Sequence, residues 1–137
     1  MPRALVVRRA HFNAAHRLHN SAQSDDWNRA TFGQCNNANY HGHNYEVEIC
    51  VEGEVDPSTG YVVDVGIIRS LFDLHVHALL DHRNLNLDVT WFADRLPSAE
   101  NIAVFIWEQL APHIPAGRLA LIRLWETPRN YVEYAGG

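Results

Sequence analysis

The sequence predicts a single α+β domain in which two long strands, two helices and two further strands follow one another along the chain. Two patterns indicate this order. Residues 41–54 alternate between apolar and polar side chains, which is the period of a half-buried strand. Residues 64–80 repeat their apolar side chains at intervals of three and four, which is typical of an amphipathic helix.

Length and composition favour one globular domain. The 137 residues fall within the roughly 100–200 that one hydrophobic core usually contains, so we expect residues 1–137 to form one domain. The net charge of −5 disfavours nucleic acid and anionic membranes as partners. No apolar run approaches the roughly 20 residues that span a bilayer, and the apolar stretch at residues 4–7 is too short for a signal peptide. The two cysteines are too few for a disulfide framework, and we expect a cytoplasmic protein.

The first half of the chain contains two candidate strands. Residues 3–16 form the first, and residues 41–54 form the second. The buried face of the second strand is predicted to carry Tyr45, Val47, Ile49 and Val51. Residues 17–40 between them are rich in polar side chains and are interpreted as a long loop, a length that is typical of functional segments.

Two helices and two strands are expected in the second half. The first helix spans residues 64–80, and its predicted core positions are Val65, Ile68, Phe72, Val76 and Leu79. The second begins after Pro97 with Ser98 as its N-cap and ends near Leu110, with Ile102, Phe105, Ile106 and Leu110 facing the core. The last strands occupy residues 119–126 and 130–135.

This order predicts a four-stranded antiparallel sheet (β-β-α-α-β-β) with both helices on one face. The other face and both edges of such a sheet remain open. Because unpaired edges of long strands invite association with further chains, we expect an oligomer.

A possible metal site begins at the second strand. His41 and His43 project from the same face of an extended strand, with their Cα atoms roughly 7 Å apart. Two ligands do not hold a metal ion, and a third can come from the other seven of the chain's nine histidines. We favour His16, which ends the first strand. Three histidines without a fourth protein ligand are typical of catalytic zinc, although ordinary polar strand ends give the same pattern.

Cys35 lies six residues before His41 among asparagines rather than among apolar residues. A thiolate is stabilised in such a polar setting when a cation is near. Two other interpretations remain open for this residue. It is either an ordinary surface thiol or a fourth zinc ligand, which would make the site closed and structural.

Three further side chains are candidates for the chemistry. Asp81 and His82 follow the first helix, and a carboxylate beside an imidazole can hold its tautomer and raise its basicity. The alternative is a histidine placed favourably at a helix C-terminus. Glu126 closes the third long strand and is either solvated or an acceptor for a ring that carries N–H donors.

Six segments together resemble one known family. They are HFNAAHRL, GQCNNANYHGHNYEV, GEVDPSTGYVVDV, LLDHRNLN, PSAENIAVFIWEQL and LWETPRNYVEY. In order and spacing they are similar to the 6-pyruvoyltetrahydropterin synthase family, which also includes the 6-carboxytetrahydropterin synthases of the queuosine pathway. The resemblance covers nearly the whole chain. It implies a T-fold whose subunits form a trimeric barrel, with two trimers stacked into a homohexamer and active sites at subunit boundaries.

The resemblance also implies roles for individual residues. His16, His41 and His43 would bind Zn²⁺, Cys35 would be the catalytic thiol, and Asp81 and His82 would be its proton relay. Glu126 would anchor the pterin, with Ser98 and Ala99 near the ring. Neither the resemblance nor the sequence assigns the residues that bind the triphosphate, for which Arg17, His19 and Arg83 are considered.

The implied activity is a lyase reaction of tetrahydrobiopterin biosynthesis. The enzyme would convert the small-molecule substrate 7,8-dihydroneopterin triphosphate to 6-pyruvoyltetrahydropterin with elimination of triphosphate. The spacing between Cys35 and His41 resembles the biopterin branch. One alternative is a 6-carboxy-5,6,7,8-tetrahydropterin synthase, which releases acetaldehyde. An alternative from a different class is a zinc-binding module without enzymatic activity.

Overall fold

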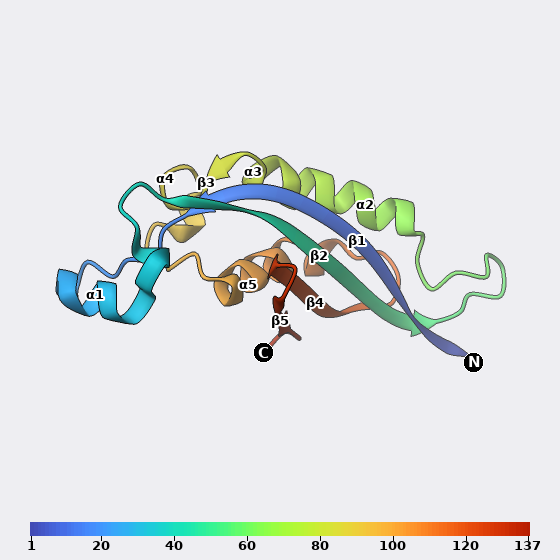
Figure 1. The fold of residues 1–137 in the computed structure, drawn as a ribbon. Coiled ribbons are helices and arrows are strands. Elements are labelled where there is room, and N and C mark those ends of the chain that lie inside the picture. Colours follow the sequence, from blue (N-terminus) through green and yellow to red (C-terminus); the bar gives the residue numbers. More distant parts are fainter.

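A computed structural model describes all residues 1–137 of the chain (Figure 1). The strands are β1 (Arg3–His16), β2 (His41–Glu54), β3 (Arg83–Asn84), β4 (Arg118–Thr127) and β5 (Asn130–Tyr134). The helices are α1 (Asp25–Phe32), α2 (Val65–Phe72), α3 (Ala78–Leu80), α4 (Leu85–Asp88) and α5 (Ala99–Leu110). Short helical turns are η1 (Gly33–Asn36), η2 (Asp73–His77), η3 (Thr90–Phe92) and η4 (Ala111–His113). No helix combines the length and the apolar character that crossing a membrane requires.

The two long strands predicted for the first half of the chain are confirmed. β1 and β2 pair antiparallel along their whole length, from Arg3 opposite Glu54 to His16 opposite His41. Figure 1 shows them as the long arched centre of the sheet. The predicted buried face of β2 is also confirmed, because Tyr45, Val47, Ile49 and Val51 are all fully buried. The alternation of side chains therefore orients every residue of β2 toward one face or the other.

The sheet has five strands in the order β3-β1-β2-β4-β5. The prediction of four strands was incomplete, because residues 83 and 84 add the short strand β3, which pairs parallel with Ala14 and Ala15 at the outer edge of β1. A strand of two residues shows no alternation of side chains, so its pairing is not visible in the sequence. The two last strands occur close to their predicted positions and form an antiparallel hairpin.

One hydrophobic core fills the space between a single face of the sheet and the helices. Its strand residues include Phe12, Tyr45 and Leu124, and its helix residues include Phe72 and Ile106. The other face of the sheet carries an ion-pair network in which Arg123 lies 2.8 Å from Glu48 and 2.6 Å from Glu133. The packing of helices on one face only agrees with the α+β prediction and leaves the charged face uncovered within one chain.

The first predicted helix is present, but it contains a π-helical turn. Residues 65–80 run through α2, η2 and α3 without a break, and Ile68, Phe72 and Val76 are buried as predicted. The core assignments of Val65 and Leu79 were wrong, because these side chains are 42% and 46% exposed. A π turn contains more residues than an α turn and rotates the next turn of the helix about its axis, so Leu80 rather than Leu79 reaches the core.

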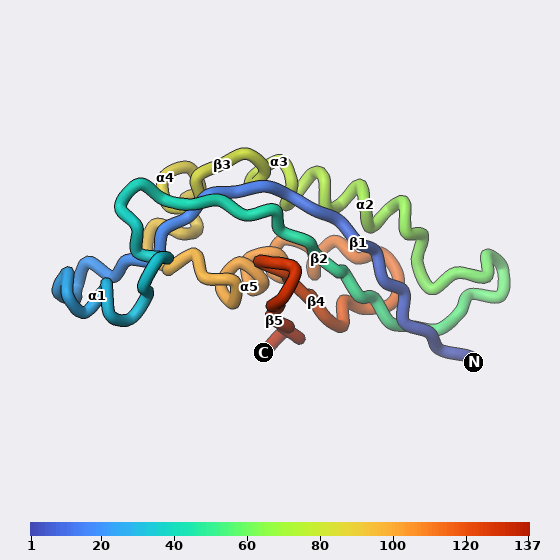
Figure 2. The backbone as a smooth tube through the Cα atoms, viewed as in Figure 1, coloured from blue at the N-terminus to red at the C-terminus, as the bar shows by residue number.

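The segment between β1 and β2 was predicted as a loop and instead contains α1 and η1. Ser24 caps α1, and its hydroxyl accepts a hydrogen bond from the Trp27 amide at 3.0 Å. Asn28 is fully buried, and its side chain bonds the backbone of the preceding turn. Figure 2 shows this excursion at the end of the two strands opposite to the N-terminus. Local polar caps, rather than apolar periodicity, stabilise the segment.

The second predicted helix is confirmed as α5. Ser98 is its N-cap, and the hydroxyl oxygen accepts a hydrogen bond from the Asn101 amide at 3.2 Å. The four side chains predicted to face the core, which are Ile102, Phe105, Ile106 and Leu110, are all buried. Pro97, the residue before this cap, contacts His16 at the end of β1 through its carbonyl oxygen. The start of α5 therefore lies beside the candidate site.

Candidate metal centre and active site

Three histidines converge where β1 ends and β2 begins. The register of the two strands places His16 directly opposite His41 and places Ala14 opposite His43. The imidazole centroids of His16, His41 and His43 are therefore only 4.5 to 5.2 Å apart. One potential ligand atom from each ring lies within 4.8 Å of the others. The pairing of β1 with β2 thus brings together the three residues that the sequence suggested as metal ligands.

The ring of His16 is fully buried and is oriented by a backbone carbonyl. Its Nδ1 lies 2.7 Å from the carbonyl oxygen of Pro97. A carbonyl oxygen only accepts hydrogen bonds, so this contact assigns the proton to Nδ1 and leaves a lone pair on Nε2. Burial lowers the pKa of His16 to about 4, and the neighbouring His41 and His43 act in the same direction. His16 is therefore neutral at pH 7, the form that binds metal ions.

The cluster lacks hydrogen-bond partners for one nitrogen of each ring. His16 Nε2, His41 Nδ1 and His43 Nε2 are buried and unpaired. Buried polar atoms without a partner are uncommon in folded proteins, and a bound cation satisfies all three at once. Three neutral imidazoles match the ligand set of a catalytic zinc ion, which leaves a further position open. The residues present therefore fit Zn²⁺.

Cys35 lies beside this cluster but is not part of it. The group of convergent ligand atoms contains the three histidines alone. The thiol sits on η1, and the Cys35 carbonyl accepts a hydrogen bond from the Leu18 amide at 2.8 Å, two residues beyond His16. Burial raises the pKa of the Cys35 thiol, and the negative charge of Glu126 raises it further. The polar loop alone therefore does not stabilise a thiolate. A nearby cation is needed, which agrees with the condition stated from the sequence.

Glu126 lies beside the histidine cluster. Its Oε1 is 4.0 Å from His43 Nε2, and both residues line a cleft of about 700 Å³. The charge of Glu126 also raises the pKa of Tyr45, after the larger effect of burial. In the same cleft the indole nitrogen of Trp125 is buried without a partner. The cleft thus presents a carboxylate acceptor next to the histidine cluster.

Ser98 and Ala99 lie at the start of α5. The Ser98 hydroxyl is engaged as the N-cap, and Ala99 is buried. The residue before them, Pro97, contacts the cluster directly through its carbonyl oxygen. Sequence reasoning missed this function of Pro97, because a backbone carbonyl leaves no signal in the side-chain pattern.

Asp81 and His82 form a hydrogen-bonded pair at the other edge of β1. His82 Nδ1 donates to Asp81 Oδ2 at 2.6 Å, and Asp81 Oδ1 accepts the Asn13 amide at 2.9 Å. The His82 amide donates to the Asn13 carbonyl at 2.6 Å, and its left-handed backbone, with φ of 58°, turns the ring back toward Asp81. Although burial alone raises the pKa of Asp81, its hydrogen bonds from Asn13 and His82 outweigh this effect and lower the pKa.

This pair lies on a different part of the sheet from Glu126, the carboxylate whose charge acts on Cys35. In the sheet order, β1 and β2 lie between the edge that holds Asp81 and the strand β4 that carries Glu126. At about 4.8 Å per strand this separation is roughly 14 Å. The ring of His82 is 81% exposed and faces outward from the chain. The two residues are thus assembled as a pair, and their role as a proton relay for Cys35 stays a prediction.

Comparison with known proteins decides the family. The model of the family described as "6-pyruvoyl tetrahydropterin synthase" matches residues 5–137. The human 6-pyruvoyl tetrahydrobiopterin synthase is 44% identical over 133 residues, covering 97% of this chain and 92% of the human protein. This chain belongs to the 6-pyruvoyl tetrahydropterin synthase family. It is accordingly an enzyme of this lyase type.

Two further proteins that are similar to this chain extend the comparison. The solved structure of the Caenorhabditis elegans 6-pyruvoyl tetrahydropterin synthase superposes with a TM-score of 0.95 at 40% identity, covering 100% of this chain and 98% of that chain. A more distant relative, the dihydroneopterin monophosphate aldolase of Pyrococcus furiosus, is 34% identical over 125 residues and covers 90% of both chains. The T-fold of the family is therefore shown for this chain.

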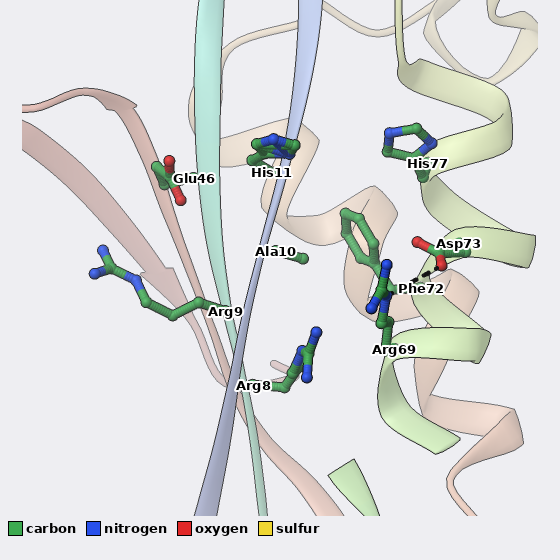
Figure 3. Close-up of a pocket in the computed structure, with 9 residues that line it drawn as sticks. All are labelled: Arg8, Arg9, Ala10, His11, Glu46, Arg69, Phe72, Asp73 and His77. Atoms are coloured by element: carbon green, nitrogen blue, oxygen red, sulfur yellow. Dashed lines mark ion pairs between the residues drawn. The ribbon is translucent and has the colours of Figure 1, made fainter. Parts of the chain in front are cut away.

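A second cleft of this synthase-family chain lies beside the Asp81–His82 pair. It has a volume of about 580 Å³ and is lined by Arg8, Arg9, Ala10, His11, Glu46, Arg69, Phe72, Asp73 and His77. Figure 3 shows His77 and the ion pair of Arg69 with Asp73 on the helix, facing Arg8 across the cleft. His77 Nε2 is also 3.5 Å from Asp81 Oδ2. Sequence reasoning missed this contact, although the spacing of four residues on a helix could have indicated it.

Proposed function

We propose that the chain catalyses the zinc-dependent conversion of 7,8-dihydroneopterin triphosphate to 6-pyruvoyltetrahydropterin with elimination of triphosphate. The observation that supports this most directly is the cluster of His16, His41 and His43, whose three unpaired nitrogens converge without a fourth protein ligand. Such a set suits a zinc ion that keeps a position open for substrate. A closed structural site would require Cys35 as an additional ligand, and the cluster does not include it.

The bound zinc ion would supply Lewis acidity that makes the side-chain hydroxyls of the substrate more acidic. Cys35 would remove and return the protons of the neighbouring C–H groups. Its thiol is only partly buried, and it interacts electrostatically with Glu126, whose carboxylate lies 4.0 Å from His43 of the cluster. Successive proton transfers reduce the ring from the dihydro to the tetrahydro level while the side chain is oxidised by the same two electrons, so no external redox cofactor is needed.

Glu126 would bind the pterin ring. Its carboxylate has two acceptor oxygens, and the 2-amino group and the ring N–H of a pterin offer two adjacent donors. The cleft that it lines includes His43, so a ring bound there would lie next to the proposed metal ligands. Ser98 and Ala99 would lie near the ring, since α5 begins where Pro97 contacts His16.

Asp81 and His82 would act on the site of a neighbouring copy. Within one chain the pair lies at the outer edge of β1, whereas Glu126 lies two strands away. Most of the β1 edge is unpaired, because β3 covers only Ala14 and Ala15, and β5 forms the opposite edge of the sheet. Pairing of these edges would build a barrel of several chains and bring each Asp81–His82 pair to another chain's cluster. A trimeric barrel, stacked into a homohexamer, is the assembly that we propose.

The biopterin branch is favoured over the queuosine branch. The human relative at 44% identity and the worm structure at 40% are both described as 6-pyruvoyl synthases. We also propose a cytoplasmic location, where both cysteines, which are free in the structure, remain thiols.

Identification of the product tests the proposal. Zinc-loaded protein is incubated with 7,8-dihydroneopterin triphosphate, and the products are separated and identified by mass. We expect 6-pyruvoyltetrahydropterin and inorganic triphosphate. Formation of a 6-carboxy product with acetaldehyde would replace this proposal by the queuosine-branch reaction. Absence of any turnover by protein that holds stoichiometric zinc would favour a zinc-binding module instead.

A further inference from the structure

A third cleft adjoins Cys35 on the side of η1. It has a volume of about 670 Å³ and is lined by Arg17, Arg29, Gly33, Gln34, Asn36, Asn37 and Ala38. Gln34 and Asn36 are the direct sequence neighbours of Cys35. Arg17 follows His16, a member of the histidine cluster. The cleft therefore touches both the segment that carries the thiol and the strand that carries the cluster.

The lining of this cleft contains two guanidinium groups, several amides and no carboxylate. Four other clefts of the fold each include an acidic side chain. The cleft of His43 contains Glu46 and Glu126, and the cleft of Figure 3 contains Glu46 and Asp73. A third contains Glu52, Glu54 and Asp56, and a fourth contains Asp64. In a chain with a net charge of −5, a concavity lined by arginines alone among charged residues is a local exception.

Arg17 is held in position by its neighbours and makes no ion pair. The Arg17 amide donates to Asn86 Oδ1 at 2.8 Å, and Asn86 Nδ2 donates back to the Arg17 carbonyl at 2.9 Å. Its Nε donates to the Asn36 carbonyl at 3.0 Å, which leaves the terminal N–H groups available. A guanidinium fixed in this way loses little conformational entropy when it binds an anion.

Arg29 supplies the second charge. It pairs with Asp26 within α1, and the two side chains are 65% and 92% exposed. An exposed pair of this kind contributes little to stability, so Arg29 can exchange this partner for a stronger anion. His19 is close by, because Asn36 Nδ2 donates to His19 Nδ1 at 2.9 Å, which assigns the ring proton to Nε2.

From this geometry we propose that the cleft of Arg17, Arg29 and Gln34 binds a polyphosphate chain, namely the triphosphate of the substrate. The inference rests on the proposed function for the identity of the ligand. A triphosphate carries several negative charges and many acceptor oxygens, which arginine binds in a bidentate manner. The cleft of Glu126 contains two carboxylates and one arginine, Arg9, so it is less favourable for such a group. The pterin ring and the phosphates of the substrate thus occupy two different clefts, and the substrate's reacting carbon atoms lie between them.

The direct test is binding of inorganic tripolyphosphate to the full chain by isothermal titration calorimetry. Gln34 is exposed, so Gln34→Lys and Gln34→Glu add opposite charges at one position without disturbing the core. We expect Gln34→Lys to tighten binding and Gln34→Glu to weaken it, each by about three- to tenfold. Replacement of either arginine by glutamine should weaken binding. We expect a loss of about tenfold for Arg17→Gln, because Arg17 is the better-positioned group, and a loss also for Arg29→Gln.

Two controls make the result specific. Arg3→Gln removes an exposed arginine at the far end of β1 and should change the affinity less than about twofold. The titrations are repeated after dialysis against EDTA, so that chelation of a bound metal ion by tripolyphosphate does not produce the heat. Equal affinities of Gln34→Lys and Gln34→Glu, or equal losses in Arg3→Gln and Arg17→Gln, would overturn the subsite.

The same variants separate this inference from the proposed function. If tripolyphosphate binding depends on Arg17 and Gln34 but the pterin triphosphate is not converted, the subsite stands and the proposed reaction fails. If the reaction proceeds with KM unchanged in Arg17→Gln and Gln34→Glu, the reaction stands and the subsite is wrong.

Discussion

The Nδ1 atom of His16 lies 2.7 Å from the carbonyl oxygen of Pro97, 81 residues further along the chain. This hydrogen bond links the end of β1 to the residue just before the N-cap of α5. It also assigns the tautomer of His16, so that Nε2 is directed to the cluster as a lone pair. The folding of α5 against the sheet and the readiness of the site for metal are therefore coupled through one contact.

The stability of the metal-free protein should fall as the pH is lowered from about 6.5 to about 4. The pKa of His16 is lowered from 6.5 to about 4 by burial, so in this window the unfolded chain binds a proton that the folded chain does not. The shift corresponds to a loss of roughly 3 kcal/mol of unfolding free energy across the window. Urea unfolding of EDTA-treated protein at pH 7 and pH 4.5 measures it. His16→Gln should show a smaller difference, and an equal difference would contradict the assignment.

Zinc content should depend on each histidine of the cluster. We expect His43→Ala and His16→Ala to lose stoichiometric zinc, because two imidazoles do not retain the ion at micromolar protein. Metal analysis of dialysed protein is the measurement. His75→Ala and His113→Ala are matched controls, since these two rings stack on each other at 4.0 Å and are not part of the cluster. Full zinc occupancy in His16→Ala would disprove its role as a ligand.

Replacement of Cys35 should stop catalysis and leave the metal in place. Cys35→Ala is expected to lower kcat by at least about 100-fold, the contribution typical of a positioned acid–base group. Cys50→Ala removes a buried thiol from the charged side of β2 and should keep most of the activity. The assay is turnover of the pterin triphosphate together with zinc analysis. Near wild-type turnover by Cys35→Ala would mean that another group moves the proton.

Glu126→Gln should make the Cys35 thiol more acidic. Burial is the larger cause of its raised pKa, and the Glu126 charge is the second, so removal of that charge lowers the pKa by part of the shift. The pH profile of iodoacetamide alkylation, measured by mass spectrometry of the Cys35 peptide, should move to lower pH. The same variant should raise KM for the pterin, because it loses one acceptor for the ring donors. An unchanged alkylation profile would show that the charge of Glu126 does not affect the pKa of the Cys35 thiol.

Two inactive variants should restore activity when they share an oligomer. If Cys35 and the Asp81–His82 pair come from different chains, hexamers that mix Cys35→Ala with His82→Ala contain some sites with both groups intact. Random mixing of equal amounts gives about one quarter of the wild-type sites. The subunits are mixed by co-expression or by unfolding and refolding together, and turnover is measured.

The matched control for this mixture is Cys35→Ala with Glu126→Gln. Both residues lie on the same side of the sheet within one chain, so every mixed site lacks one of them. This mixture should recover no wild-type site. Activity in the control, or none in the first mixture, would refute a site completed by the neighbouring chain.

Local patterns of the sequence were sufficient for the long elements. The alternation from His41 to Glu54 predicted β2 and its buried face, and Ser98 predicted the start of α5. The π turn was not predictable, because inserting one residue into a helix changes which of Leu79 and Leu80 is buried without changing the apolar pattern. The helix α1 was missed for a different reason, since polar capping stabilises it and its buried residue is the polar Asn28 rather than an apolar one.

The sequence by itself determined which side chains can carry the chemistry, because residue type and spacing along a strand decide that His41 and His43 share one face. Only the tertiary structure decided how these groups are combined. The register of β1 against β2 brings His16 to the pair, and the Pro97 carbonyl orients it. The Asp81–His82 pair is placed at the outer edge of β1, so that β1 and β2 lie between it and the strand that carries Glu126. These relationships depend on contacts between segments far apart in the chain, and no local pattern of residues encodes such distances.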